Sequence, residues 1–193
     1  MRLEDLAEEI LRCEKCPLHL NRKRAVPGEG NPNSRIMFIG EAPGRNEDEM
    51  GRPFVGAAGK LLEELLSSIG LRRQDVFITN VVKCRPPNNR DPRLEEIEAC
   101  LPYLKAQIEL IDPEILVPLG RHSVGVLLGR IGDVSIMRVR GKVYEVEVFG
   151  TSRKVLPTLH PAAALYNPRL KPLIREDFER LRSLISSGLE RWL

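Results

Sequence analysis

Four cysteines occur in this chain, and their spacing is typical of a metal site. Two residues separate Cys13 from Cys16, and fifteen separate Cys84 from Cys100. One tetrahedral zinc ion or one cubane iron–sulfur cluster needs four thiolates. Because thiols in a cytoplasmic protein stay reduced, we expect these cysteines to bind a metal rather than to form disulfides, with small buried thiols as the alternative. The spacing does not distinguish zinc from iron, and either metal would tie the N-terminal arm (residues 1–34) to the middle of the chain.

Helices and strands must position these thiols and the other candidate residues. The spacing of apolar residues predicts where those helices and strands lie. Helical spacing predicts helices at residues 3–12, 59–69, 122–128 and 170–186. A further helix is predicted to open at Asp91-Pro92 and to be interrupted or kinked at Pro102 before it continues to about Leu110. Apolar runs predict core strands at residues 35–39, 75–82, 114–119 and 154–159. Alternating residues predict a hairpin over 136–149 with its turn at Gly141-Lys142, and a turn-rich segment over 161–168.

Strands that alternate with helices through short connections predict the fold class. It is α/β: a single three-layer α/β/α domain over residues 1–193, with a central, mostly parallel four-stranded sheet and a cysteine-bound cluster. In such sheets, ligands bind beyond the carboxyl ends of the strands. The segments at those ends are Gly40–Gly44, Asn80, Gly120-Arg121 and His160. Their polar groups are therefore the site candidates.

The overall composition excludes several classes of protein. The 193 residues are 42% apolar and 30% charged, which is unlike a disordered or fibrous chain and is sufficient for a hydrophobic core. No apolar run is long enough to span a membrane, and the acidic start MRLEDLAEEI is unlike a signal peptide. We therefore expect a cytoplasmic protein with no membrane partner.

The charge distribution is more informative than the net charge. A formal net charge of +3 does not by itself indicate a polyanionic partner. Basic residues nevertheless gather at 22–24, 83–93 and 121–154. Such patches are typical of a nucleic-acid-binding surface, and solvated surface charge is the alternative.

Taken together, several ordered motifs resemble one family. They are GEAPG at 40–44 followed by Glu47-Asp48, RPFVGAAGKLL at 52–62, TNVVKCRPP at 79–87 and HPAAAL at 160–165. With the cysteine pattern, the chain is similar to the family 4 uracil-DNA glycosylases, the iron–sulfur type of bacteria and archaea, from Cys13 to about Pro168. The resemblance implies a uracil-DNA glycosylase-like fold, a 4Fe-4S cluster on the four cysteines, and uracil-containing DNA, double- or single-stranded, as the substrate.

The resemblance also implies a reaction and a set of binding residues. A monofunctional enzyme of this kind flips deoxyuridine and hydrolyses the N-glycosidic bond, which leaves an abasic site and starts base-excision repair. Phe54 would stack on the base, and the Asn80 amide would read its N3–H and O4, a pattern that cytosine reverses. His160 and the backbone N–H of Ala42 would donate to O2 of the departing anion, with Gly40 completing the binding set. A core phenylalanine and a strand-end turn former are the alternatives for Phe54 and Asn80.

One position departs from the wider superfamily. The best-known uracil glycosylases position water with an Asp where this chain has Ala42, and family 4 also lacks that Asp. Our hypothesis is that Glu41 or Asn89 positions the water. Glu47 would form the cavity wall near C5 of uracil, where a methyl group must be excluded.

Further residues are expected to contact DNA. A minor-groove wedge must fill the gap left by the flipped base, and Leu165 is the first choice and Tyr166 the second, with packing under the last helix as the alternative. Residues 188–193 have a faint likeness to sliding-clamp peptides, so a clamp is considered as a partner, although packing of the helix end is favoured. We expect a monomer. The residues expected to contact phosphates are Lys83, Arg85 and Arg90.

Other functions account for parts of the sequence. A non-catalytic, metal-stabilised DNA-binding module explains the cysteines and basic patches but leaves Phe54, Asn80 and His160 without a role. A broader glycosylase for deaminated bases, acting on hypoxanthine as well as uracil, differs in cavity size, which the sequence does not reveal. A phosphate-binding loop at 56–60 is excluded, because it needs Gly at position 54 and Ser or Thr at position 61. His19 and His122 are assigned to surface or packing.

Overall fold

Strand β2 (Ile36–Gly40) lies at the centre of the sheet, and all five of its residues are buried. Met37 and Ile39 pack into one hydrophobic cluster, whereas Ile36 and Phe38 pack into a second cluster. Successive side chains of a strand point to opposite faces, so the two clusters lie on the two faces of the sheet. The continuous apolar run reflects burial on both faces, as in parallel sheets.

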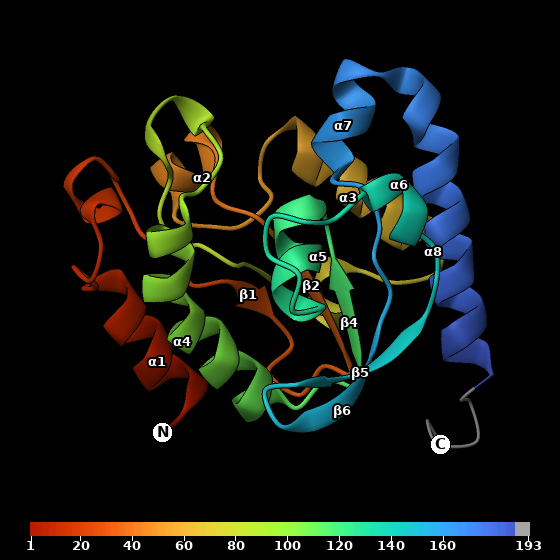
Figure 1. The fold of residues 1–193 in the computed structure, drawn as a ribbon, viewed down its shortest axis with the longest axis horizontal. Helices are drawn as coiled ribbons and strands as arrows, with labels where there is room; N and C mark the ends of the chain where they lie inside the picture. The colour runs from red at the N-terminus through yellow and green to blue at the C-terminus, as the bar shows by residue number, and fades with distance from the viewer. Residues whose placement is uncertain (188–193) are drawn as a thin grey trace.

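The computed structural model describes residues 1–187, in which six strands form one sheet in the order β1-β3-β2-β4-β6-β5 (Figure 1). The four inner strands pair in parallel, which confirms the predicted parallel core. The sheet is larger than the predicted four strands, because an antiparallel strand adds to each edge. The other strands are β1 (Glu29–Gly30), β3 (Phe77–Asn80), β4 (Ile115–Pro118), β5 (Tyr144–Val148) and β6 (Thr151–Val155).

Helices cover both faces of this sheet and complete three layers. The cluster on one face includes apolar residues of α1 and α4, and the cluster on the other face includes those of α3 and α8. Figure 1 accordingly shows α1 and α4 on one side and α3, α7 and α8 on the other. The three-layer prediction is therefore confirmed. The helices are α1 (Leu3–Leu11), α2 (Arg45–Met50), α3 (Ala57–Ser68), α4 (Leu94–Ile111), α5 (Arg121–Leu127), α6 (Ile136–Val139), α7 (Pro161–Tyr166) and α8 (Lys171–Ser186).

The hairpin forms, but its turn lies at a different position from the predicted one. Residues 136–139 form α6, and the hairpin consists of β5 and β6 joined at Phe149-Gly150. Gly141, which was assigned to the turn, has φ +70°, and a Cβ there would lie 2.5 Å from Oδ1 of Asp177. This glycine therefore permits close packing against α8 rather than a hairpin turn. The segment predicted as turn-rich after His160 contains α7.

Helix α4 also differs from its prediction. It begins at Leu94 rather than Pro92, because the Glu96 carboxylate accepts the Arg93 N–H at 2.8 Å and caps the helix there. It continues through Pro102 to Ile111 without the predicted interruption. Pro102 lies on the exposed side, where water can satisfy the carbonyl that loses its partner. No helix in residues 1–187 is both long and apolar enough to cross a membrane.

Candidate active site

A cavity of about 460 Å³ lies at the carboxyl ends of the central strands, where the sequence predicts it. A bridge between Leu119 and Thr158 extends the parallel pairing of β4 and β6, so Gly120 and His160 emerge side by side. A Cβ at Gly120 would lie 3.3 Å from both the Glu41 carboxyl and Cβ of His160. The predicted residues that line the cavity are Glu41, Ala42, Glu47, Phe54, Asn80, Asn89, Arg90, His160 and Tyr166.

Asn80 ends β3 with its side chain buried against the cavity. It is only 2% exposed, and its Oδ1 has no hydrogen-bond partner in the described protein. Gly40, paired with it on β2, allows this placement: a Cβ at Gly40 would lie 2.3 Å from Oδ1 of Asn80 and 2.7 Å from the Phe54 ring. A buried acceptor without a hydrogen-bond partner reduces the free energy of unfolding, unless a ligand donates a hydrogen bond to it. Asn80 therefore suits a ligand that brings an N–H donor.

Phe54 forms an aromatic wall of the cavity. Its ring stacks on the His160 imidazole, with 5.4 Å between centroids and 25° between planes. Its backbone has φ +51°, a left-handed conformation that non-glycine residues rarely adopt. A Cβ at Gly59 would lie 1.8 Å from the Phe54 carbonyl oxygen, so only glycine in α3 lets the loop lie this close.

His160 caps the N-terminus of α7. Its Nδ1 accepts a hydrogen bond from the Ala162 N–H at 3.1 Å, so in the neutral ring the proton lies on Nε2. Burial lowers the pKa of His160 to about 4, although Glu47 opposes this shift. The imidazole is thus neutral near pH 7 and can act as a hydrogen-bond donor through Nε2. No acceptor within residues 1–187 bonds the Ala42 N–H, which is a second donor at this edge.

Glu41 belongs to a group of charged residues beside the cavity. Its Oε2 accepts the His122 backbone N–H at 3.3 Å and lies 3.7 Å from Nε2 of His122, which is 3.3 Å from Asp91. Burial raises the pKa of Glu41, and His122 opposes part of the rise. The assignment of His122 to surface or packing overlooked this contact with a site residue. Its position just after Gly120-Arg121, at a strand end, was the available signal.

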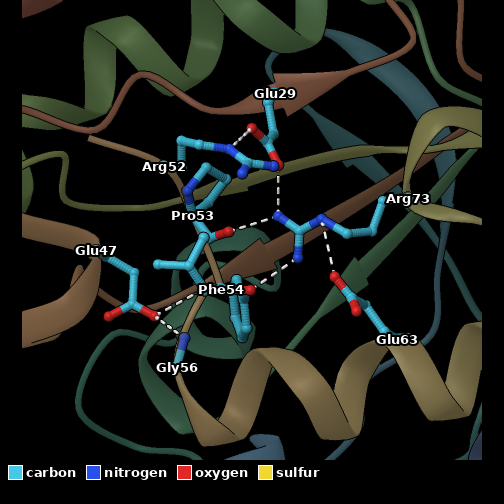
Figure 2. Close-up of polar contacts among 9 residues, drawn as sticks. Glu29, Glu47, Arg52, Pro53, Phe54, Gly56, Glu63 and Arg73 are labelled. Carbon is cyan, nitrogen blue, oxygen red and sulfur yellow. Dashed lines mark hydrogen bonds and ion pairs between the residues drawn. The ribbon is translucent and has the colours of Figure 1, made fainter. Parts of the chain in front are cut away.

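Glu47, at the start of α2, binds the backbone of the loop that carries Phe54. Its Oε1 accepts the N–H groups of Val55 and Gly56 at 3.0 and 3.1 Å (Figure 2). Its Oε2 accepts the Gly44 N–H at 3.1 Å. The carboxylate therefore joins the GEAPG segment to the Phe54 loop, in addition to lining the cavity.

All four cysteines line one small, mainly apolar hollow near β3 and between the N-terminal arm and α4. Burial raises the pKa of the Cys84 thiol, and that of Cys100 to about 11. Donors already point at the sulfurs: Nη1 of Arg22 lies 3.1 Å from Sγ of Cys84, and the Lys83 N–H lies 3.3 Å from Sγ of Cys100. Converging donors of this kind stabilise thiolates, so the donor set fits a thiolate-ligated metal group.

Lys83, predicted to contact DNA, is buried in the structure. The residue is 1% exposed, and its ammonium bonds Oγ1 of Thr79, the Asn80 carbonyl and Oε1 of Gln107 at 2.7, 2.6 and 2.6 Å. Three acceptors satisfy the three N–H groups of the ammonium. Lys83 therefore braces the strand end that carries Asn80.

The other residues predicted to contact DNA lie on or near the surface. Arg85 donates to Oδ1 of Asn89 at 2.7 Å, and Arg90 forms an ion pair with Glu96 at 2.6 Å. Leu165 is 49% exposed and Tyr166 is 90% exposed, so neither is held in the core under α8. The sliding-clamp likeness at 188–193 lies outside the described residues.

The mostly parallel sheet, the cavity at its carboxyl edge with Asn80, Phe54 and His160, and the hollow lined by four cysteines define a small α/β protein with a site suited to a planar ligand. The Uracil DNA glycosylase superfamily model matches residues 27–182, and the chain belongs to this superfamily. Similar proteins narrow the assignment to its type-4 branch, which confirms the resemblance drawn from the motifs.

Three type-4 uracil-DNA glycosylases illustrate this similarity. The protein of Sulfurisphaera tokodaii is 56% identical over 185 residues, covering 94% of this chain and 84% of the relative. That of Saccharolobus solfataricus is 55% identical, covering 96% and 87%. That of Archaeoglobus fulgidus is 53% identical, covering 94% and 92%. The similarity thus extends over almost the whole chain.

Proposed function

We propose that this protein is a monofunctional uracil-DNA glycosylase that flips deoxyuridine out of DNA, hydrolyses the N-glycosidic bond and leaves an abasic site. One observation carries the proposal. An unpartnered acceptor on Asn80 and a neutral donor on His160 line the same cavity beside the Phe54 ring. This combination matches a planar base that presents N–H and C=O groups and departs as an anion.

Asn80 and Phe54 select the base. Oδ1 of Asn80 accepts the uracil N3–H, and its amide N–H donates to O4. Cytosine presents the opposite pattern, an acceptor at N3 and a donor at N4, and would leave the buried amide unpaired. Phe54 stacks on the ring, and Gly40 leaves room for the contact. Glu47 forms the wall near C5, where its three backbone hydrogen bonds keep the wall in place.

His160 and Ala42 assist departure of the base. As the glycosidic bond breaks, negative charge develops on uracil O2 and positive charge on the sugar. The Nε2–H of His160 and the N–H of Ala42 donate to O2. The imidazole is neutral because its pKa is far below 7, and a neutral imidazole donates this hydrogen bond without giving up its proton. Glu41 or Asn89 positions the attacking water. Glu41 is favoured, because Oδ1 of Asn89 already accepts from Arg85.

Surface residues around the cavity bind the DNA. Leu165 is proposed as the wedge and Tyr166 as its neighbour, because both are exposed on α7 directly after the His160 cap. Arg85 and Arg90 are proposed to contact phosphates from the loop between β3 and α4. That the protein acts as a monomer, with or without a sliding clamp, stays a prediction.

We propose a 4Fe-4S cluster on Cys13, Cys16, Cys84 and Cys100. The four cysteines line one small hollow, and donors from Arg22 and Lys83 already lie within hydrogen-bond distance of the sulfurs of Cys84 and Cys100. Four thiolates in one place are the ligand number that a cubane cluster needs. When bound, the cluster supplies a rigid joint between the arm, β3 and α4. Iron and sulfide analysis of anaerobically purified protein tests this, and stoichiometric zinc instead would contradict it.

The activity is tested with a labelled duplex that carries one U opposite G. Incubation followed by alkali should cleave the labelled strand at the uracil, and mass spectrometry should find free uracil. A matched duplex with hypoxanthine distinguishes the broader glycosylase. Equal release of both bases would favour that alternative, and no release of either would contradict the proposed function.

A further inference from the structure

The Phe54 loop is held in a conformation that its own sequence does not favour. Phe54 combines φ +51° with a side chain that is 5% exposed, and the loop meets α3 at Gly59 with backbone in close contact. A bulky residue in the left-handed region persists only where the surroundings determine it. Other side chains must therefore fix this loop, and with it the position of the ring.

Arg73 binds the loop without lining the cavity. It lies in the 3₁₀ turn Arg73–Asp75 before β3, nineteen residues after Phe54. Its Nη1 donates to the Phe54 carbonyl at 2.8 Å, and its Nη2 donates to the Pro53 carbonyl at 2.6 Å (Figure 2). Its side chain is 16% exposed. One guanidinium therefore bridges two consecutive carbonyls at the left-handed residue.

Acidic residues orient this guanidinium. Oε1 of Glu29 on β1 accepts from Nη2 of Arg73 at 2.6 Å, and Nε of Arg73 lies 3.6 Å from Glu63 on α3. The same Glu29 binds Arg52 at 2.8 and 2.9 Å, two residues before Phe54. Burial would raise the pKa of Glu29, but the hydrogen bonds from Arg52 and Arg73 outweigh it and keep the carboxyl ionised. Glu29 on the edge strand thus holds Arg52 directly and the Pro53 and Phe54 carbonyls through Arg73.

Glu47 completes the arrangement from the other side of the loop. It accepts the two N–H groups that follow Phe54, whereas Arg73 donates to the two carbonyls at and before Phe54. Figure 2 shows the two side chains approaching the loop from different directions. The Arg73 guanidinium therefore holds the backbone at and before Phe54, and the Glu47 carboxylate holds the backbone after it.

We propose that Arg73 is a positioning residue for base excision, which acts by holding Phe54 where its ring meets both the flipped base and His160. This inference rests on the proposed function. Arg73 is absent from the lining of the base cavity, so it acts through Phe54 and not by contact with the base. Its hydrogen bonds to the two loop carbonyls, rather than its charge alone, carry the effect.

The test compares Arg73→Gln with Arg72→Gln under single-turnover conditions with saturating enzyme. Arg72 is a matched control, because it is adjacent, 70% exposed in its side chain and forms its ion pair with Asp75 rather than bonding the carbonyls of Pro53 and Phe54. Arg73→Gln should slow uracil release about 10-fold or more, as a misplaced binding group does, while Arg72→Gln should stay within about 2-fold of wild type. Equal rates for the two variants would overturn the proposal.

A double-mutant cycle separates positioning from general destabilisation. In a Phe54→Leu background, Arg73→Gln should slow the reaction by less than about 2-fold, because the group through which it acts is already gone. Effects that multiply would overturn the proposal. If Arg73→Gln does not fold, Arg73→Lys replaces it: the ammonium keeps the charge but lacks the planar fork, so a wild-type rate in that variant would contradict the inference. Failure of the wild type to release uracil would instead contradict the proposed function.

Discussion

The Phe54 ring lies against the His160 imidazole, with 5.4 Å between their centroids. The residue proposed to stack on the base and the residue proposed to donate to it are therefore in contact before any base enters. This contact also contributes to the burial that lowers the His160 pKa to about 4. Phe54 and the neutral imidazole of His160 consequently depend on each other for their positions. The burial of His160 also affects the stability of the protein in a measurable way.

Stability should fall on acidification because of His160. Its pKa is about 4 in the folded protein and 6.5 in the unfolded chain, so the unfolded state binds more protons between these values. The free energy of unfolding should therefore decrease as pH falls from 6.5 to about 4, by at most about 3 kcal/mol from this group. Urea unfolding at several pH values measures this. His160→Gln should lose that part of the pH dependence, and an unchanged slope in the variant would contradict the assignment.

The acid limb of the pH–rate profile should belong to Glu41. Burial raises the pKa of this carboxyl, and only the carboxylate can orient water through both oxygens. Uracil release should thus slow as pH falls through that raised pKa. Glu41→Gln should be slower by about 10²-fold and should lack this limb, whereas Asn89→Ala should keep it. A rate loss of this size in Asn89→Ala, with Glu41→Gln close to the wild-type rate, would assign the water to Asn89.

A methyl group at position 40 should block the base cavity. In Gly40→Ala the new Cβ meets Oδ1 of Asn80 at 2.3 Å and the Phe54 ring at 2.7 Å, so both groups must shift. Single-turnover excision should fall by about 100-fold. Gly70→Ala is the control: it has φ +78°, but its Cβ meets nothing within 4 Å, so it should cost about 1 kcal/mol of stability and leave the rate unchanged. Equal rates in both variants would disprove the close contact.

Lys83 should matter for folding and not for phosphate binding. Lys83→Met leaves Oγ1 of Thr79, the Asn80 carbonyl and Oε1 of Gln107 without their shared donor, and should reduce the free energy of unfolding by about 2 kcal/mol. Fluorescence anisotropy against salt measures DNA binding. The salt slope should be unchanged in Lys83→Met and smaller by about one in Arg85→Met. A reduced slope in the Lys83 variant would restore the original prediction for that residue.

Much of the fold follows from local patterns, and the exceptions have physical causes. Buried apolar runs identify the inner strands because a parallel strand is covered on both faces, as β2 is. The sequence does not reveal that Gly141 packs closely against Asp177, a residue 36 positions further along the chain, so it predicts a hairpin turn at this glycine that the fold does not form. Pro102 does not interrupt α4, because only tertiary structure shows that it lies on the exposed side.

The site was predictable where residue type and strand end coincide. Asn80 ends β3, and His160 lies just after the Thr158 bridge that extends β6, so the parallel sheet brings the two residues to one edge. Lys83 shows the limit of this reasoning, because a basic residue in a basic segment gives no sign that its side chain turns inward. Arg73 and Glu29 lie far apart in the sequence and outside every motif, and only the folded chain joins them at 2.6 Å.

Uracil release by wild type, His160→Ala and Asn80→Ala, measured beside their DNA affinity, tests the central claim most directly. Each protein is mixed in excess with a duplex carrying one U opposite G, and free uracil is quantified by mass spectrometry. The account predicts release by the wild type and a loss of at least about 10²-fold in both variants, with affinity for the duplex largely kept. Tight binding without release by the wild type, or release that survives both substitutions, would contradict it.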